Sequence, residues 1–199
     1  MFSRSIVALG VALAAALTAY EGVTLADDAP STDDYGPSPT DVSAHPTHTL
    51  TIDPGSMALG IVKVEYESAI SSWSSVYVAP SVLAFKSPLL SEPQDSSLVA
   101  AGVDTGVRFF FTGRAPEGVW IGPQVGLAYV QGSVNGEQAS AVGYDCAALF
   151  GGTVLVANVV DVSAGLGVAY VNEQVAVGDT NVGVSGLTPA LRLALGVAF

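Results

Sequence analysis

The last nine residues of the chain, LRLALGVAF, alternate large apolar and smaller residues with a period of two. Leu191, Leu193, Leu195, Val197 and Phe199 fall on one side of this segment. Such a period is typical of a β-strand, because a helix would bring every third or fourth residue to one face. A wholly apolar stripe at a chain end needs an apolar surface to face. The terminus therefore predicts a strand that lies against a protein core or a lipid bilayer.

The composition of the chain is unusually apolar for a soluble protein. Of its 199 residues, 50% are hydrophobic and 12% are charged, whereas about a quarter of the residues are charged in a typical soluble domain. The formal net charge is -12, from 6 Lys and Arg against 18 Asp and Glu. This balance excludes nucleic acid as a partner, because the chain has no basic patch to neutralise phosphates.

The N-terminal part of the chain differs from the rest. Residues 1–26 have the pattern of a secretory signal peptide, with a basic residue, an apolar run and a small-residue cleavage site, TLA. A membrane anchor helix is the alternative, but the run is short and acidic residues follow it. Residues 27–46, DDAPSTDDYGPSPTDVSAHP, are acidic and rich in Pro and Ser, so they cannot bury enough apolar surface to fold. We expect export with cleavage, a disordered linker, and a folded domain over residues 47–199.

Alternation of apolar with small or polar residues continues through that domain, in segments long enough for a tilted transmembrane strand of about 9–11 residues. The segments predicted as strands are about 57–68, 75–86, 98–112, 118–131, 139–150, 158–171 and 188–199. Bacterial single-chain barrels have an even number of strands. The segment THTLTID, residues 47–53, therefore supplies the first strand. The predicted fold is all-β, an eight-stranded antiparallel up-and-down transmembrane β-barrel that is porin-like in architecture.

The segments between the strands are predicted as loops and turns. The outer loops are NEQVAVGDTNVGVSG, QGSVNGEQ, KSPLLSEPQDSS and the brief DPGS, and the periplasmic turns are GGTVLVAN, TGRAPEG and AISSWS. Pro80 and Pro123 oppose the assignment, because each would remove a ladder hydrogen bond inside a strand. We expect them at bulges or near the membrane interfaces.

The less apolar face of the strands is mostly Gly, Ala and Ser with a few charges, as expected for the crowded interior of a narrow barrel. The apolar face then points outward, to lipid, and an open channel is not expected. Buried charges must pair, so the sequence predicts an internal ion network, with a ligand or proton path as the alternative. Its predicted members are Lys63, Glu65, Asp104, Arg108, Asp145, Asp161 and Arg192.

Aromatic residues fall towards the predicted strand ends, where interfacial girdles form in membrane barrels. The alternative is that aromatic residues simply mark strands. The residues predicted for the girdles are Tyr66, Trp73, Tyr77, Trp120, Tyr129, Phe150, Tyr170 and Phe199.

Three segments carry a resemblance to known proteins: VKVEYESAI, GVRFFFTGRAPEGVWIGPQVGLAYV and LTPALRLALGVAF. They resemble the small outer-membrane β-barrel domain proteins of Gram-negative bacteria, in particular the DUF3575-like set, over roughly Leu50 to Phe199. The terminal stripe from Leu191 to Phe199 resembles the signal that the outer-membrane insertion machinery reads. The resemblance implies a fold and an outer-membrane location, and it supplies no catalytic residues.

Residues that carry catalysis or bind metal are scarce. The two histidines, His45 and His48, lie in the linker and at the edge of the first strand, so no predicted loop offers a His base for hydrolysis or acyl transfer. Their spacing supplies two metal ligands without a third. Cys146 is the single cysteine; it permits no intrachain disulfide, and its phase places it on the lipid face. We predict no enzyme activity, no metal and no cofactor.

The sequence therefore predicts a monomeric outer-membrane barrel with a structural or surface-interaction role, whose partners are outer-membrane lipid and the barrel insertion machinery. An alternative is a soluble exported β-barrel or sandwich that binds an apolar small molecule in its core. A third possibility is a helical hairpin in the inner membrane that uses Cys146 to Val160. That stretch contains a Gly pair and is shorter than the about 18 residues of a spanning helix.

Overall fold

The structure is a computed structural model that describes residues 45–58, 60–83, 96–134, 137–177 and 180–199. The predicted signal peptide and nearly all of the predicted linker lie outside the described residues. The elements are β1 (His48–Ile52), α2 (Pro54–Ala58), β2 (Ile61–Ser71), β3 (Ser74–Leu83), β4 (Ser96–Phe110), β5 (Gly118–Val134), β6 (Glu137–Val156), β7 (Val160–Val177) and β8 (Thr180–Ala198). Within the described part of the chain, no helix has the length and hydropathy needed to cross a membrane.

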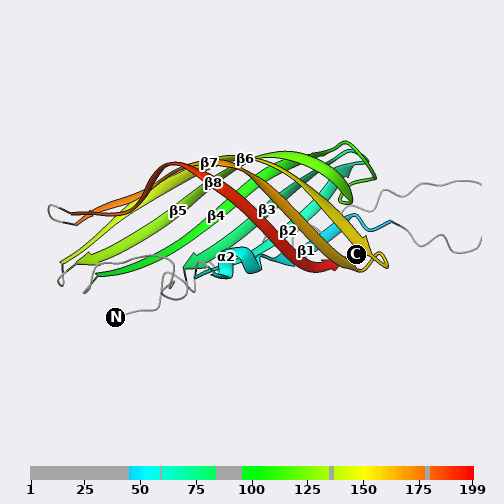
Figure 1. The fold of residues 1–199 in the computed structure, drawn as a ribbon. Helices are drawn as coiled ribbons and strands as arrows, with labels where there is room; N and C mark the ends of the chain where they lie inside the picture. The colour runs from blue at the N-terminus through cyan, green and yellow to red at the C-terminus, as the bar shows by residue number, and fades with distance from the viewer. Residues whose placement is uncertain (1–44, 59, 84–95, 135–136, 178–179) are drawn as a thin grey trace, which may run out of the picture. The chain divides into compact units, whose positions relative to one another are not determined.

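Each strand pairs antiparallel with the next, and β8 pairs with β1, so the sheet closes into a barrel (Figure 1). The predicted all-β fold, with eight antiparallel strands in up-and-down order, is confirmed. The segment THTLTID does supply the first strand, β1. The helical hairpin over Cys146 to Val160 is wrong, because this stretch forms the end of β6, a turn and the start of β7.

The seam between β1 and β8 is short. It joins four residue pairs, from Thr49↔Ala198 to Ile52↔Leu195, although β8 itself has 19 residues. Backbone hydrogen bonds of 2.9 Å in both directions between His48 and Phe199 extend it by one step. The C-terminal residue is thus part of the closure of the barrel.

Beyond Ile52 the chain leaves the sheet and forms α2, so the prediction of DPGS as a plain loop is wrong. Asp53 caps this helix, because its carboxylate accepts hydrogen bonds from the backbone N–H and the hydroxyl of Ser56 at 3.0 and 3.1 Å. Pro54 stands at the first helical position, where its missing N–H costs nothing. A Cβ on Gly55 would lie 3.6 Å from Cβ of Leu193, so α2 lies beside β8 where β1 has ended.

The strands on the C-terminal side of the barrel are longer than predicted. β6 continues to Val156 and so includes most of GGTVLVAN; the turn is residues 157–159, in which Ala157 and Asn158 have φ of 55° and 56°. Two residues with positive φ are typical of a tight β-hairpin turn. QGSVNGEQ and NEQVAVGDTNVGVSG also contribute residues to paired strands, at the far ends of β5–β6 and β7–β8. These three predicted connections are wrong in extent, whereas TGRAPEG does connect β4 and β5.

Pro80 and Pro123 lie inside β3 and β5, each beside a break in one ladder. The β2–β3 register has no pairs for Ala79 and Pro80, and the β4–β5 register has none for Gly122 and Pro123. Each proline remains paired on its other side, with Val103 and Ala148 respectively. A residue without an N–H is tolerated where the neighbouring ladder is already interrupted.

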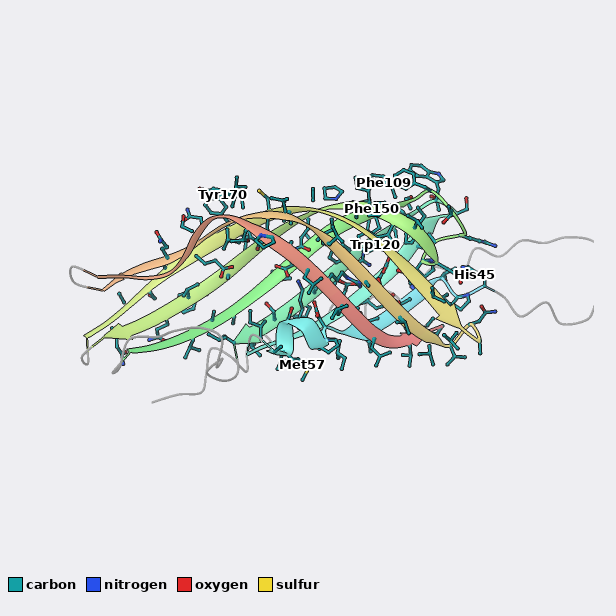
Figure 2. All side chains as sticks on the ribbon, viewed as in Figure 1. His45, Met57, Phe109, Trp120, Phe150 and Tyr170 are labelled. Atoms are coloured by element: carbon teal, nitrogen blue, oxygen red, sulfur yellow. The ribbon has the colours of Figure 1, made fainter. Side chains whose placement is uncertain are left out.

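The two faces of the wall have opposite polarity. Trp120 lies within the barrel, whereas Phe109, Phe150 and Tyr170 lie along its outside (Figure 2). The buried polar and charged residues include Thr49, Thr51, Glu65, Glu67, Ser75, Arg108, Thr153, Asp161, Ser163 and Arg192. Large apolar side chains are exposed on every strand, among them Leu50, Ile70, Val76, Val103, Leu127, Val142, Leu166 and Leu191. The predicted orientation of the two faces is therefore confirmed: small and charged residues point inward, and large apolar residues point outward.

Candidate functional site

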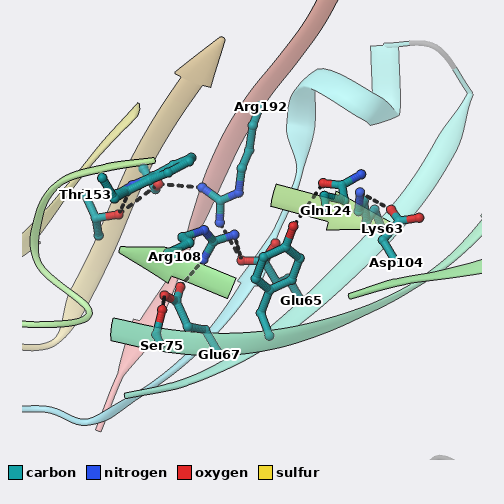
Figure 3. A network of polar contacts seen from close by, with 12 residues as sticks. Lys63, Glu65, Glu67, Ser75, Asp104, Arg108, Gln124, Thr153 and Arg192 are labelled. Atoms are coloured by element: carbon teal, nitrogen blue, oxygen red, sulfur yellow. Dashed lines mark hydrogen bonds and ion pairs between the residues drawn. The ribbon is translucent and has the colours of Figure 1, made fainter. Parts of the chain in front are cut away.

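The barrel interior contains most of the charged side chains that the structure describes as buried. Arg108 of β4 is the central residue of their hydrogen-bond network. This guanidinium is 1% exposed. Its Nη2 donates to Oε1 of Glu65 at 2.8 Å, and its Nη1 donates to Oε2 of Glu67 (Figure 3). Both carboxylates come from β2, two residues apart on its inward face. Arg192 of β8 donates to the same oxygen of Glu65 at 2.6 Å. One arginine thus bridges two carboxylates, and one carboxylate bridges two arginines.

Hydroxyl groups form further hydrogen bonds with these ions. Ser75 donates to the second oxygen of Glu67. Nη1 of Arg192 donates to Oγ of Ser163 at 2.5 Å, and Thr153 donates to the same oxygen at 3.0 Å. These contacts supply the hydrogen bonds that a buried ion pair requires to be stable.

Two aromatic residues cover the faces of the buried guanidinium groups. The ring of Tyr77 lies 4.2 Å from Cζ of Arg108, and the ring of Trp120 lies 5.0 Å from the same atom and 5.8 Å from Cζ of Arg192. Such stacking is favourable, because the ring face carries partial negative charge. The indole Nε1 of Trp120 donates to Thr153 at 3.1 Å. The prediction that Tyr77 and Trp120 belong to a girdle is wrong, because both side chains are buried inside the barrel.

A second cluster contains three of the other predicted charges of the interior, Lys63, Asp104 and Asp145. Lys63 of β2 and Asp104 of β4 form an ion pair whose side chains are 17% and 14% exposed. Gln124 joins this cluster to the first, since its Oε1 accepts from Tyr77 at 3.0 Å and its Nε2 donates to Asp145 at 3.4 Å. A Cβ on Gly126 would overlap the carboxylates of Asp104 and Asp145, so this glycine leaves the space that both occupy.

The structure brings together most of the predicted network residues, but in separate groups. Glu65, Arg108 and Arg192 form the central group, Lys63 pairs with Asp104, and Asp145 contacts Gln124. Asp161 is buried, and among the described residues it forms no ion pair. Sequence reasoning missed Glu67, although it has the same phase as Lys63 and Glu65. Sequence reasoning also missed the inward position of Trp120. Trp120, Gly122 and Gln124 are alternate residues of β5 and therefore lie on the same face, so this spacing could have shown it.

The remaining candidate residues lie away from the interior. Cys146 is a free, exposed cysteine. His45 is hydrogen-bonded to the carbonyl of Arg114 at 3.0 Å, and Nδ1 of His48 to the hydroxyl of Tyr66 at 2.9 Å. In the part of the chain that the structure describes, no three His, Cys, Asp or Glu residues are grouped to hold a metal. The five residues of the predicted insertion signal, Leu191, Leu193, Leu195, Val197 and Phe199, are exposed on the outer face.

The glycines beside Trp120 allow a sharp test of interior packing. A Cβ on Gly151 would lie 2.5 Å from Cζ2 of Trp120 and would also overlap the carbonyl oxygen of Ala164. We expect Gly151→Ala to lower the free energy of unfolding by about 1–3 kcal/mol, the usual range for an overpacked core. The control is Gly152→Ala, whose Cβ would meet nothing nearer than 3.8 Å. Equal losses for both variants in denaturant titrations would contradict the packing of Trp120 against Gly151.

Comparison with known proteins adds no information: no family model matches the chain, and neither a curated protein nor a solved structure does. The resemblance to the DUF3575-like set therefore stays a prediction that rests on the quoted segments. Function has to be argued from the geometry of the barrel.

Proposed function

We propose that this chain is an outer-membrane β-barrel protein with a structural or surface-interaction role. The observation that carries the proposal is the polarity of the wall, which exposes large apolar side chains on all eight strands and buries charged ones inside. Soluble monomers rarely expose continuous apolar patches larger than a few hundred Å². A closed sheet also satisfies its backbone polar groups internally, which a bilayer demands.

The predicted signal peptide and the terminal stripe support the same location. A chain with a predicted signal peptide, whose β8 exposes the apolar stripe from Leu191 to Phe199, suits delivery to the outer-membrane insertion machinery. We propose lipid and that machinery as the partners, and a monomer as the working state, because the closed barrel has no strand left for pairing with a second copy along its ring.

The interior supports a structural role over conduction. At the level of Arg108 and Trp120 the barrel is filled by paired ions and an indole ring, and both residues are at most 1% exposed. The C-terminal strands supply the surface for interaction. β5 to β8 have 17–20 residues each, more than the about 9–11 that cross a bilayer. Their far ends would therefore project beyond the membrane.

The alternative of a soluble exported protein that binds an apolar small molecule requires an apolar interior. The described interior is instead lined by Glu65, Glu67, Arg108 and Arg192, which argues against that function.

The proposal is tested by fractionating cells that express the full chain and running the protein on SDS gels with and without boiling. We expect the protein in the outer-membrane fraction, with a mobility that changes on heating, because a closed barrel resists SDS until it is heated. A soluble periplasmic protein whose mobility is indifferent to heating would contradict the proposal.

A further inference from the structure

Three buried side-chain oxygen atoms form no hydrogen bond of standard geometry with the described residues, although Thr49 lies beside the carboxyl group of Asp161: Oγ1 of Thr49, Oγ1 of Thr51 and Oδ1 of Asp161. Their residues are 0%, 2% and 1% exposed. Buried polar atoms in native proteins are almost always paired with protein or with bound solvent. Three unpartnered oxygens of this kind therefore point to an occupant other than protein.

The strand register places these residues around one space. Thr51 of β1 and Asp161 of β7 lie on opposite sides of β8, and both are paired with the same residue, Gly196. Thr49 is paired with the next inward residue of β8, Ala198. Neighbouring strands are about 4.8 Å apart, and glycine contributes no side chain. The oxygens of β1 and β7 thus face each other across the inner surface of β8.

The charges around this space do not balance. The central group contains the carboxylates of Glu65 and Glu67, which hydrogen-bond to the guanidinium groups of Arg108 and Arg192. Asp161 adds a third carboxylate without a third cation, and it forms no ion pair among the described residues. An unbalanced buried charge is strongly unfavourable.

We propose that Asp161, Thr49 and Thr51 bind one small monovalent cation such as Na⁺. Hard cations take carboxylate and hydroxyl oxygens as ligands. A single positive charge neutralises the single excess carboxylate, whereas a divalent ion would reverse the imbalance. A water molecule would satisfy the hydroxyl groups but would leave the charge in place. The site belongs to the barrel interior, so it does not depend on where the barrel resides.

The test uses the full chain, purified in detergent micelles, and follows thermal unfolding by tryptophan fluorescence at fixed pH. Na⁺ is titrated against tetramethylammonium at constant ionic strength. We expect the Tm of the wild type to rise with Na⁺ concentration, because an ion that binds only the folded state shifts the equilibrium by mass action. At one hundred times Kd the folding equilibrium constant should increase about a hundredfold.

Variants assign that response to the site. Asp161→Asn should abolish the response to Na⁺ and should have a higher Tm than the wild type when Na⁺ is absent, since the amide removes the unbalanced charge. Asp104→Asn is the matched control, because it alters a carboxylate of the Lys63 pair and should keep the response. The double variant Thr49→Val and Thr51→Val should require a higher concentration of Na⁺ for half of the effect.

A wild-type Tm that does not change with Na⁺ concentration would overturn the proposal. The three oxygens would then be satisfied by a water molecule or by protonation of Asp161. A Tm that depends on pH but not on Na⁺ would identify the proton and overturn it equally. If Asp161→Asn does not fold, ²³Na relaxation of the wild type decides: line broadening that excess Li⁺ competes away supports the site, and its absence contradicts it.

Discussion

Replacing Arg108 with methionine is expected to destabilise the barrel by about 3–5 kcal/mol, the range measured when one partner of a buried ion pair is removed. Arg108 donates to both Glu65 and Glu67, and only Glu65 has a second arginine. Glu67 would remain 1% exposed with the hydroxyl of Ser75 as its hydrogen-bond donor. Methionine retains apolar contact with the neighbouring rings. The decrease in the free energy of unfolding therefore results mainly from removal of the charge and only to a small extent from the change in side-chain volume. Denaturant titrations of the protein in micelles, followed by tryptophan fluorescence, measure it.

Two variants make this prediction specific. Arg108→Met combined with Glu67→Gln should recover part of the lost stability, because the amide removes the uncompensated charge. Lys63→Met should cost less than Arg108→Met, since the side chains of Lys63 and Asp104 are 17% and 14% exposed and water partly screens the carboxylate that remains. If Arg108→Met were no more harmful than Lys63→Met, the central ions could not be a buried network.

The barrel could be predicted from the sequence because its main determinant is local. Alternation with a period of two is set by neighbouring residues, and it predicted the approximate positions of the strands and their two faces. The even number of strands in such barrels then required a strand over residues 47–53. The extent of β6 depends on residues far along the chain. Gly151 and Gly152 have the local character of a turn, yet Gly151 and Gly165 lie in paired strands and leave room for the ring of Trp120. A local sequence pattern cannot predict contacts between side chains of distant strands, such as those of Trp120 with Gly151 and Gly165.

In the candidate site, too, local sequence predicted some features, whereas others depend on residues far apart in the chain. Parity predicted which charges point inward, because each strand places alternate side chains on one face. Their partners depend on the stagger of the strands around the ring, which brings Arg192 to Glu65 across 127 positions of sequence. The stagger also leaves Asp161 beside two threonines instead of an arginine. Glu67 was within reach of sequence reasoning, since it extends the inward series of Lys63 and Glu65.

Replacing Leu166 with lysine is expected to cost about 2–4 kcal/mol in assembly into lipid vesicles, if the outer wall faces hydrocarbon as proposed. Leu166 is 66% exposed on the outer face of β7, and its pairing partners Phe150 and Leu191 are exposed apolar residues too. A lysine there would place a charge in the proposed lipid-facing belt. On a water-exposed surface the same change would alter stability by no more than about 0.5 kcal/mol. Reversible unfolding of the vesicle-inserted protein measures the difference.

The matched control is Val159→Lys, at the turn between β6 and β7. Val159 is 54% exposed, so both variants place the same charge at an exposed apolar position. The turn marks the end of the wall and should lie at the interface, where charged side chains cost about 0–1 kcal/mol. A large loss for Leu166→Lys with a small loss for Val159→Lys would support a belt of hydrocarbon contact. If Leu166→Lys inserted with wild-type stability, the apolar wall would face something other than lipid, and the outer-membrane proposal would fail.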